Sequence, residues 1–220
     1  MKSDNLKFLG VSSGRSGSVY IATVMNLIGI PVIHEQHFIA SEYIENEPSQ
    51  WDHPEIGCWT AQAAGQLSKF PDVKIFHQVR DPLKVIASFY KWQQFTTDRN
   101  GHIELNDINS MYLNDYFDVY SEPNQLSRIT KYWIKSNLEY EQYSCKRWRV
   151  EDIDTSLMME IGEILGMKLD PRKISQVLKQ VSKRTNGQKR TPLNQRKLFK
   201  ELSPELQDSL QDMMVRYGYG

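Results

Sequence analysis

The sequence has little of what marks several protein classes. Among its 220 residues only Cys58 and Cys145 are cysteines, and their spacing is typical of neither a metal site nor a disulfide framework. No apolar run is long enough to span a bilayer, and residues 1–6 lack the apolar centre of a signal peptide. These absences predict a cytoplasmic protein with reduced thiols and no membrane span.

A net charge is also absent, because 27 Lys and Arg residues balance 27 Asp and Glu residues. The charges are nevertheless segregated along the chain. Residues 171–200 contain ten Lys or Arg and no acidic residue, whereas the charged residues of 34–55 are all acidic, with three histidines among them. Two solvated surfaces of opposite sign explain most of these charges, and we expect no nucleic-acid partner.

The order of apolar segments predicts the fold class. A length of 220 residues suits a single α/β domain, residues 1–220. Apolar runs at residues 6–11, 31–33, 73–79 and 147–150 predict strands, and the short strand–helix–strand unit at the start implies a mainly parallel sheet. Helical patterns separate or follow these strands, at residues 18–28, 54–69, 82–90, 125–143, 157–165, 174–181 and 204–214. Gly29 is a natural stop for the first of these helices, and Ser203 is a cap for the last. We therefore predict a three-layer sandwich with helices on both faces of a central sheet.

A glycine-rich loop joins the first strand to the first helix. It contains Gly14, Arg15, Ser16 and Gly17, and the helix begins at Ser18 and Val19. Gly14 and Gly17 permit backbone conformations closed to other residues and allow close approach to the backbone. A helix N-terminus offers N–H groups and a positive dipole end, so the loop is typical of a phosphate site. It differs from the nucleoside triphosphatase P-loop, because the run from Gly10 to Gly14 is one residue short and Arg15 replaces the lysine.

A second motif follows the strand at residues 73–79. Arg80 ends the strand, Asp81 and Pro82 suit the start of a helix, and Ser88 lies eight residues after Arg80. A forked cation at the carboxyl end of a strand and a hydroxyl on the next helix can hold one phosphate from two sides.

Together the two motifs resemble those of sulfotransferases that use 3′-phosphoadenosine 5′-phosphosulfate (PAPS), of the P-loop-like, soluble bacterial type. The resemblance implies that Gly14, Arg15, Ser16, Gly17, Ser18 and Val19 hold the 5′-phosphosulfate and that Arg80 and Ser88 hold the 3′-phosphate. Residues 148–152 look like the family's R-x-E-D strand end, and 216–219 resemble its frequent terminal Leu-Gly-Tyr. Arg184 and Arg190 are in a basic segment, 183–190, where relatives close a cationic loop over the 3′-phosphate, although the usual Arg-Lys-Gly triplet is absent.

The chemistry that the resemblance implies is an in-line transfer of a sulfuryl group to a hydroxyl or amine of a small-molecule or carbohydrate acceptor. Arg15 would stabilise the leaving group, adenosine 3′,5′-bisphosphate (PAP), and the scheme requires no metal. The general base would be Glu35, with His34 or His37 as alternatives. Two other functions stay open: a nucleotide or small-molecule kinase with a degenerate P-loop, and a non-catalytic nucleotide-binding protein of the same fold.

Overall fold

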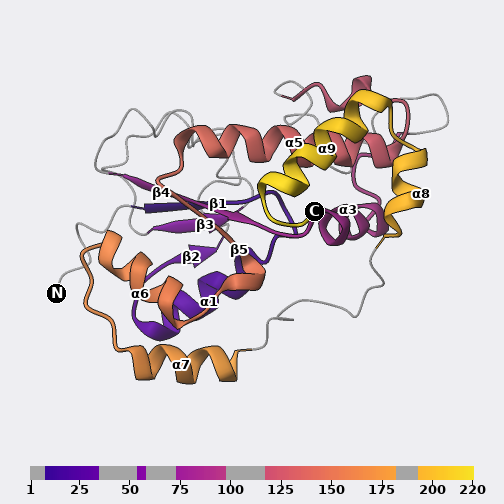
Figure 1. Ribbon diagram of the computed structural model, residues 1–220. Helices are drawn as coiled ribbons and strands as arrows, with labels where there is room; N and C mark the ends of the chain where they lie inside the picture. The colour runs from indigo at the N-terminus through magenta and orange to yellow at the C-terminus, as the bar shows by residue number, and fades with distance from the viewer. Residues whose placement is uncertain (1–7, 35–53, 58–72, 98–116, 182–192) are drawn as a thin grey trace. The chain divides into compact units, whose positions relative to one another are not determined.

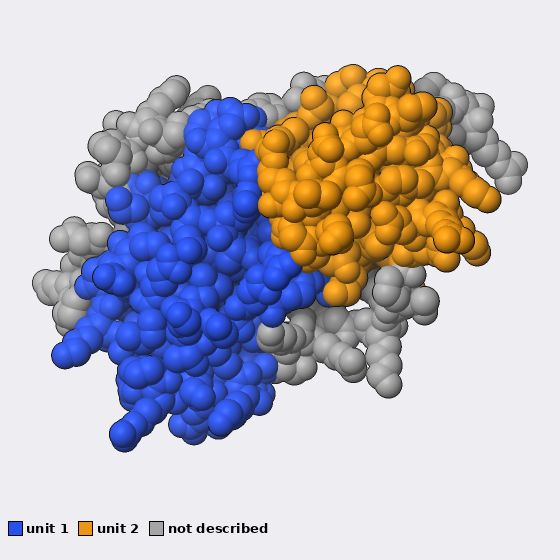
Figure 2. Space-filling model, in the orientation of Figure 1, with its two compact units in different colours: residues 1–80, 139–188 blue, residues 81–138, 189–220 orange. Residues whose placement is uncertain are grey.

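The chain packs as two compact units. The computed structural model describes residues 8–34, 54–57, 73–97, 117–181 and 193–220 (Figure 1). Unit 1 comprises Met1–Arg80 and Glu139–Gln188, and unit 2 comprises Asp81–Leu138 and Lys189–Gly220 (Figure 2). The single domain expected over residues 1–220 stays a prediction.

Unit 1 is built on an open parallel sheet. Its strand order is β2-β3-β1-β4-β5, and each neighbouring pair is parallel. The α/β class with a mainly parallel sheet, predicted from the sequence, is thus confirmed. The strands are β1 (Phe8–Val11), β2 (Ile33–His34), β3 (Glu55–Gly57), β4 (Lys74–Val79) and β5 (Lys146–Arg149).

Both faces of this sheet are buried, as parallel strands require. On one face Phe8, Phe76 and Trp148 pack in a row, with ring centroids 5.7 and 5.6 Å apart, beneath three helices. These helices are α1 (Ser18–Ile28), α6 (Thr155–Ile164) and α7 (Pro171–Gln180), and they lie together on one side of the sheet (Figure 1). On the other face Leu9 packs with Tyr140, near the end of α5 (Gln125–Tyr143).

Strand β3 corrects the sequence-based prediction. The sequence pattern predicts a helix at 54–69, but Glu55–Gly57 forms a strand between β1 and β2; residues 58–69 lie outside the described part of the chain. Pairing on both sides overrides the weak local preference of so short a segment. The packing of β3 against β1 explains the glycine inside β1, because a Cβ on Gly10 would lie 2.5 Å from Cγ1 of Ile56.

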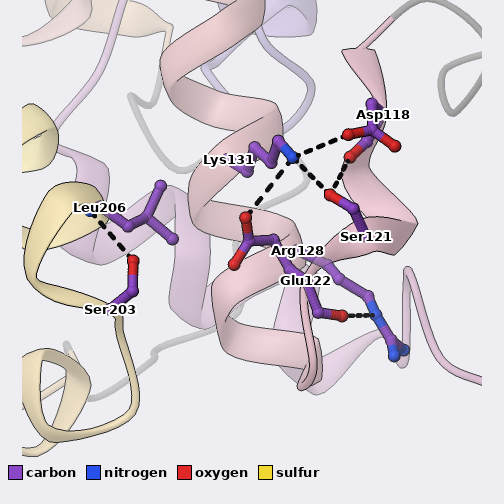
Figure 3. A network of polar contacts seen from close by, with 7 residues as sticks. All are labelled: Asp118, Ser121, Glu122, Arg128, Lys131, Ser203 and Leu206. Carbon is purple, nitrogen blue, oxygen red and sulfur yellow. Dashed lines mark hydrogen bonds and ion pairs between the residues drawn. The ribbon is translucent and has the colours of Figure 1, made fainter.

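The helix boundaries mostly follow the predicted capping residues. Helix α1 ends at Gly29 in the left-handed conformation, with φ of 105°. In unit 2 the Asp81 carboxylate accepts from the Leu83 N–H at the start of α3 (Pro82–Lys91). Ser203 Oγ accepts from the Leu206 N–H at the start of α9 (Pro204–Arg216), as Figure 3 shows. The short helix α8 (Gln195–Lys200) was not predicted.

Unit 2 contains a polar network that anchors residues 117–124 to α5 (Figure 3). Arg128 is buried and donates from Nε to the Glu122 carbonyl at 2.9 Å. Lys131 Nζ lies 3.2 Å from Asp118 Oδ2 and 2.6 Å from Ser121 Oγ, at the ends of the 3-10 helix η3 (Val119–Ser121). A hydrogen bond from Ser121 and the Lys131 ammonium lower the pKa of Asp118 below its usual value.

Among the helices that the structure describes, none combines the length with the apolar character that crossing a membrane requires.

Candidate phosphate-binding site

The loop between β1 and α1 has the conformation of an anion-binding turn. Arg15 and Gly17 both adopt positive φ, 66° and 89°, on either side of buried Ser16. The sequence suggested that Gly14 and Gly17 would provide this freedom; the structure places it at Arg15 and Gly17 instead. Consecutive residues of opposite handedness turn backbone N–H groups into one concavity, which suits an anion.

The start of α1 adds further donors to this loop. Gly17 is the N-cap and has no side chain to accept from the N–H groups of the first turn, which begins at Ser18 and Val19. Within the loop, the hydroxyls of Ser13 and Ser16 are hydrogen-bonded at 2.9 Å. The exposed side chain of Arg15 adds a positive charge beside these donors.

Two residues at the end of β4 donate hydrogen bonds to the carbonyl groups of the loop. Arg80 Nη1 donates to the Arg15 carbonyl at 2.9 Å, and Gln78 Nε2 donates to the Ser16 carbonyl at 2.8 Å. Since β4 pairs directly with β1, the loop and Arg80 lie at the same edge of the sheet. The structure therefore brings the first predicted motif together with the arginine of the second.

Two buried polar atoms at this edge have no hydrogen-bond partner among the described residues. They are Oγ of Ser12, directly after β1, and Nε of Arg80. A buried donor without a partner costs free energy, so such atoms are expected where a polar ligand completes the hydrogen bonds. Their presence beside a loop rich in N–H groups fits an anionic ligand.

The residues that follow β5 pack against the loop at Gly17. Arg149 forms a bidentate ion pair with Asp152, at 2.5 and 2.8 Å, which fixes the turn of the predicted R-x-E-D segment. Val150 follows Arg149, and its Cγ2 lies 3.0 Å from the position that a Cβ on Gly17 would take. Gly17 is thus required both by its positive φ and by the packing of Val150.

His34, one of the candidate bases, contacts the phosphate loop region itself. Its Nε2 lies 2.8 Å from Oγ of Ser18, the first residue of α1. This places the end of β2 beside the helix N-terminus, as expected for a parallel sheet. Glu35 and His37, the other candidates, lie outside the described residues.

The remaining predicted ligands are not assembled by the described structure. Arg184 and Arg190 lie outside the described residues. Ser88 is buried in α3 of unit 2, whereas Arg80 is the last residue of unit 1, so its part in holding a 3′-phosphate stays a prediction.

Sequence reasoning missed the roles of Gln78, which donates to the loop, and of Trp148, which donates to Gln78. The signal was available: Gln78 is a polar residue inside the apolar strand of residues 73–79, and a buried polar side chain needs partners.

Comparison with known proteins gave matches only to solved structures. No protein-family profile and no curated protein matches the sequence. The chain is similar to mouse sulfotransferase SULT7A1 complexed with PAP, at a TM-score of 0.46 and 11% identity, over 96% of this chain and 84% of that one. It is also similar to a sulfotransferase from Alicyclobacillus acidocaldarius, at a TM-score of 0.45 and 6% identity, over 96% of both chains.

A third similar structure is retinol dehydratase in a complex with retinol and PAP, at a TM-score of 0.39 and 13% identity, over 81% of this chain and 65% of that one. The family that the sequence motifs resemble is thus represented among these structures.

Proposed function

We propose that this protein is a sulfotransferase that takes a sulfuryl group from PAPS and transfers it to a hydroxyl or amine. One observation carries the proposal: a loop with positive φ at Arg15 and Gly17 opens a helix, and Arg80 donates directly to that loop. An anion-binding turn and a forked cation from the adjacent strand suit a ligand with two separate phosphate groups. PAPS has this character, since it has a 5′-phosphosulfate and a 3′-phosphate.

In the proposed assignment the loop residues Gly14–Val19 receive the 5′-phosphosulfate, and Arg80 reaches toward the 3′-phosphate. The buried Nε of Arg80 and Oγ of Ser12 are polar atoms that such a ligand would satisfy. Arg184, Arg190 and Ser88 remain further candidates for the 3′-phosphate. The acceptor class, a small molecule or a carbohydrate, also stays a proposal.

The transfer itself needs a base and a stabilised leaving group. The base, Glu35 or one of the histidines at the end of β2, removes the proton of the acceptor hydroxyl or amine. The acceptor atom then bonds to sulfur as the bond from sulfur to the 5′-phosphate oxygen breaks, and PAP leaves with the electron pair. Arg15 and the N–H groups at the start of α1 stabilise the charge that develops on this oxygen.

The alternative kinase function would need a strand-end carboxylate to hold magnesium. Asp81 follows β4 and is the natural candidate, but its side chain accepts from the Leu83 N–H at 2.9 Å and lies 3.2 Å from Lys84 Nζ. Its carboxylate is thereby committed to starting α3. Together with Arg15 in place of the P-loop lysine, this contact favours sulfuryl transfer.

Calorimetric titration with PAP and with adenosine 5′-monophosphate, both in EDTA, tests the proposal. We expect PAP to bind at least about tenfold more tightly, because Arg80 offers a charged donor to the 3′-phosphate. Equal affinity for the two nucleotides, or binding of neither, would refute the proposed donor.

A further inference from the structure

Gln78 is a buried amide with partners on both sides. It is 2% exposed, accepts from Trp148 Nε1 at 3.1 Å, and donates from Nε2 to the Ser16 carbonyl at 2.8 Å. The indole nitrogen can only donate and the carbonyl can only accept, so these two partners fix the orientation of the amide. The contacts follow from the sheet, since Gln78 and Trp148 are register partners on β4 and β5.

The Ser16 carbonyl has a stereochemical consequence for the loop. In a planar trans peptide the C=O of one residue and the N–H of the next point in opposite directions. When Gln78 holds the Ser16 carbonyl, the Gly17 N–H therefore points away from Gln78. Arg80 acts in the same way one residue earlier, because its bond to the Arg15 carbonyl turns the Ser16 N–H away from Arg80.

Two anchored carbonyls thus present two consecutive N–H groups to the ligand side of the loop. The conformation needs such support, because the positive φ of Arg15 is unfavourable for a residue with a side chain. Val150, packed over Gly17, adds a steric support from β5. Of these supports only Gln78 is a buried, uncharged hydrogen-bond donor, and the proposed ligand contacts do not include it.

We infer that Gln78, oriented by Trp148, is a positioning residue that holds the loop in its anion-binding conformation. The inference rests on the proposed function for its ligand, since PAP is the anion that the loop is proposed to receive. Gln78 itself touches no reacting atom in this scheme. Its contribution is to fix the direction of backbone donors before the ligand arrives.

The test compares three variants with the wild-type protein. Gln78→Met keeps the length of the side chain and removes both hydrogen bonds. Trp148→Phe leaves the bond from Gln78 to Ser16 in place, but removes the donor to Gln78 together with part of the ring that packs against Phe76. The control is Asn26→Ala, which breaks the bonds of Asn26 to both the N–H and the carbonyl of Val32, two helical turns beyond the loop. It lowers stability in the same unit without touching the loop.

Two measurements are made on each protein. NMR couplings and chemical shifts of Arg15 and Gly17 in the ligand-free protein report the left-handed conformation, and calorimetry gives the PAP affinity. We expect Gln78→Met to lose the left-handed signature and to bind PAP about tenfold more weakly, or about 1.4 kcal/mol. Trp148→Phe should shift both readouts in the same direction by less, and Asn26→Ala should shift neither.

The inference is wrong if Gln78→Met keeps the wild-type NMR signature and PAP affinity, or if Asn26→Ala alters them as much. Should Gln78→Met not fold, the same comparison is decided by Trp148→Phe. A wild-type protein that does not bind PAP would overturn the proposed function instead, and the ligand-free NMR comparison would still decide the role of Gln78.

Discussion

Arg15 combines an unfavourable backbone with an exposed charge, a combination expected where function requires it. Its φ of 66° costs on the order of 1 kcal/mol for a residue with a side chain. Arg80 and Gln78 offset this cost through their bonds to the carbonyls of Arg15 and Ser16. The sequence revealed the chemical character of Arg15 but not its conformation, which depends on contacts from a strand more than sixty residues later, since Arg80 and Arg15 are 65 positions apart.

Arg80→Ala should weaken PAP binding much more than binding of adenosine 5′-phosphosulfate, which lacks the 3′-phosphate. A charge-assisted hydrogen bond contributes about 1.5–3 kcal/mol, or roughly ten- to 150-fold in Kd. Titration of both ligands measures the difference. Arg80→Lys is the control, because it keeps the charge and loses the fork, and it should restore part of the affinity. Equal losses for the two ligands would mean that Arg80 only supports the loop.

Variants of the candidate bases can be distinguished by whether each one impairs PAP binding or turnover. Glu35→Gln should bind PAP normally and lose most turnover, if Glu35 is the base. His34→Asn should instead weaken PAP binding, because His34 Nε2 is hydrogen-bonded to Ser18 at the helix N-terminus. Titration with PAP and turnover with an identified acceptor measure both. Turnover that survives in Glu35→Gln and is lost in His34→Asn or His37→Asn would assign the base to histidine.

At the scale of elements, the junction of β1 and α1 depends on Gly17. Gly17→Ala should lower both stability and PAP affinity, because Cβ disfavours φ of 89° and would lie 3.0 Å from Val150. Gly29→Ala is a matched control at the other end of α1: φ is 105°, with nothing within 4 Å of the added Cβ. Each change should cost about 1–2 kcal/mol in backbone strain, measured by urea unfolding. A PAP affinity that falls equally in both variants would contradict a local role for Gly17.

The contact between α5 and η3 makes the stability of unit 2 depend on pH. The lowered pKa of Asp118 means that its ionised form stabilises the folded state above the usual pKa of about 4. This contribution is lost as the pH falls through the lowered, folded-state pKa. Asp118→Asn should therefore reduce the Tm at neutral pH, and its difference from the wild type should narrow in acid. Asp208→Asn, at an exposed position of α9, is the control. If the difference in Tm between Asp118→Asn and the wild type stayed constant across pH, the Asp118 carboxylate would not be the source of the pH dependence.

The elements that the sequence predicts well are those with local signals. The helix of residues 125–143 was predicted with the bounds that α5 has, and caps at Asp81 and Ser203 gave the starts of α3 and α9. Strand β3 has one apolar residue, Ile56, and exists because β1 and β2 pair with it, so no local pattern could predict it. Gly10 was the available signal, since a glycine inside a strand often marks a close approach.

For the whole molecule, the order of strands assembles the site from distant segments. The loop after β1, Arg80 after β4 and Val150 after β5 meet because parallel strands direct their carboxyl ends to one edge of the sheet. The two motifs could be recognised in the sequence, whereas the buried support from Gln78 and Trp148 required the sheet order. The loop, Arg80, Gln78 and Trp148 all belong to unit 1, whereas Ser88 of the second motif belongs to unit 2.

The central claim, that this site receives PAPS, is tested most directly by thermal unfolding of the wild-type protein with PAP in EDTA and, separately, with magnesium and ATP. PAP at about 100 times its Kd should stabilise the protein by about 2.7 kcal/mol, a clear rise in Tm. Magnesium and ATP at the same concentration should give a smaller rise, because the loop lacks the P-loop lysine and Asp81 is committed to α3. A rise with magnesium and ATP and none with PAP would contradict the account and favour a kinase.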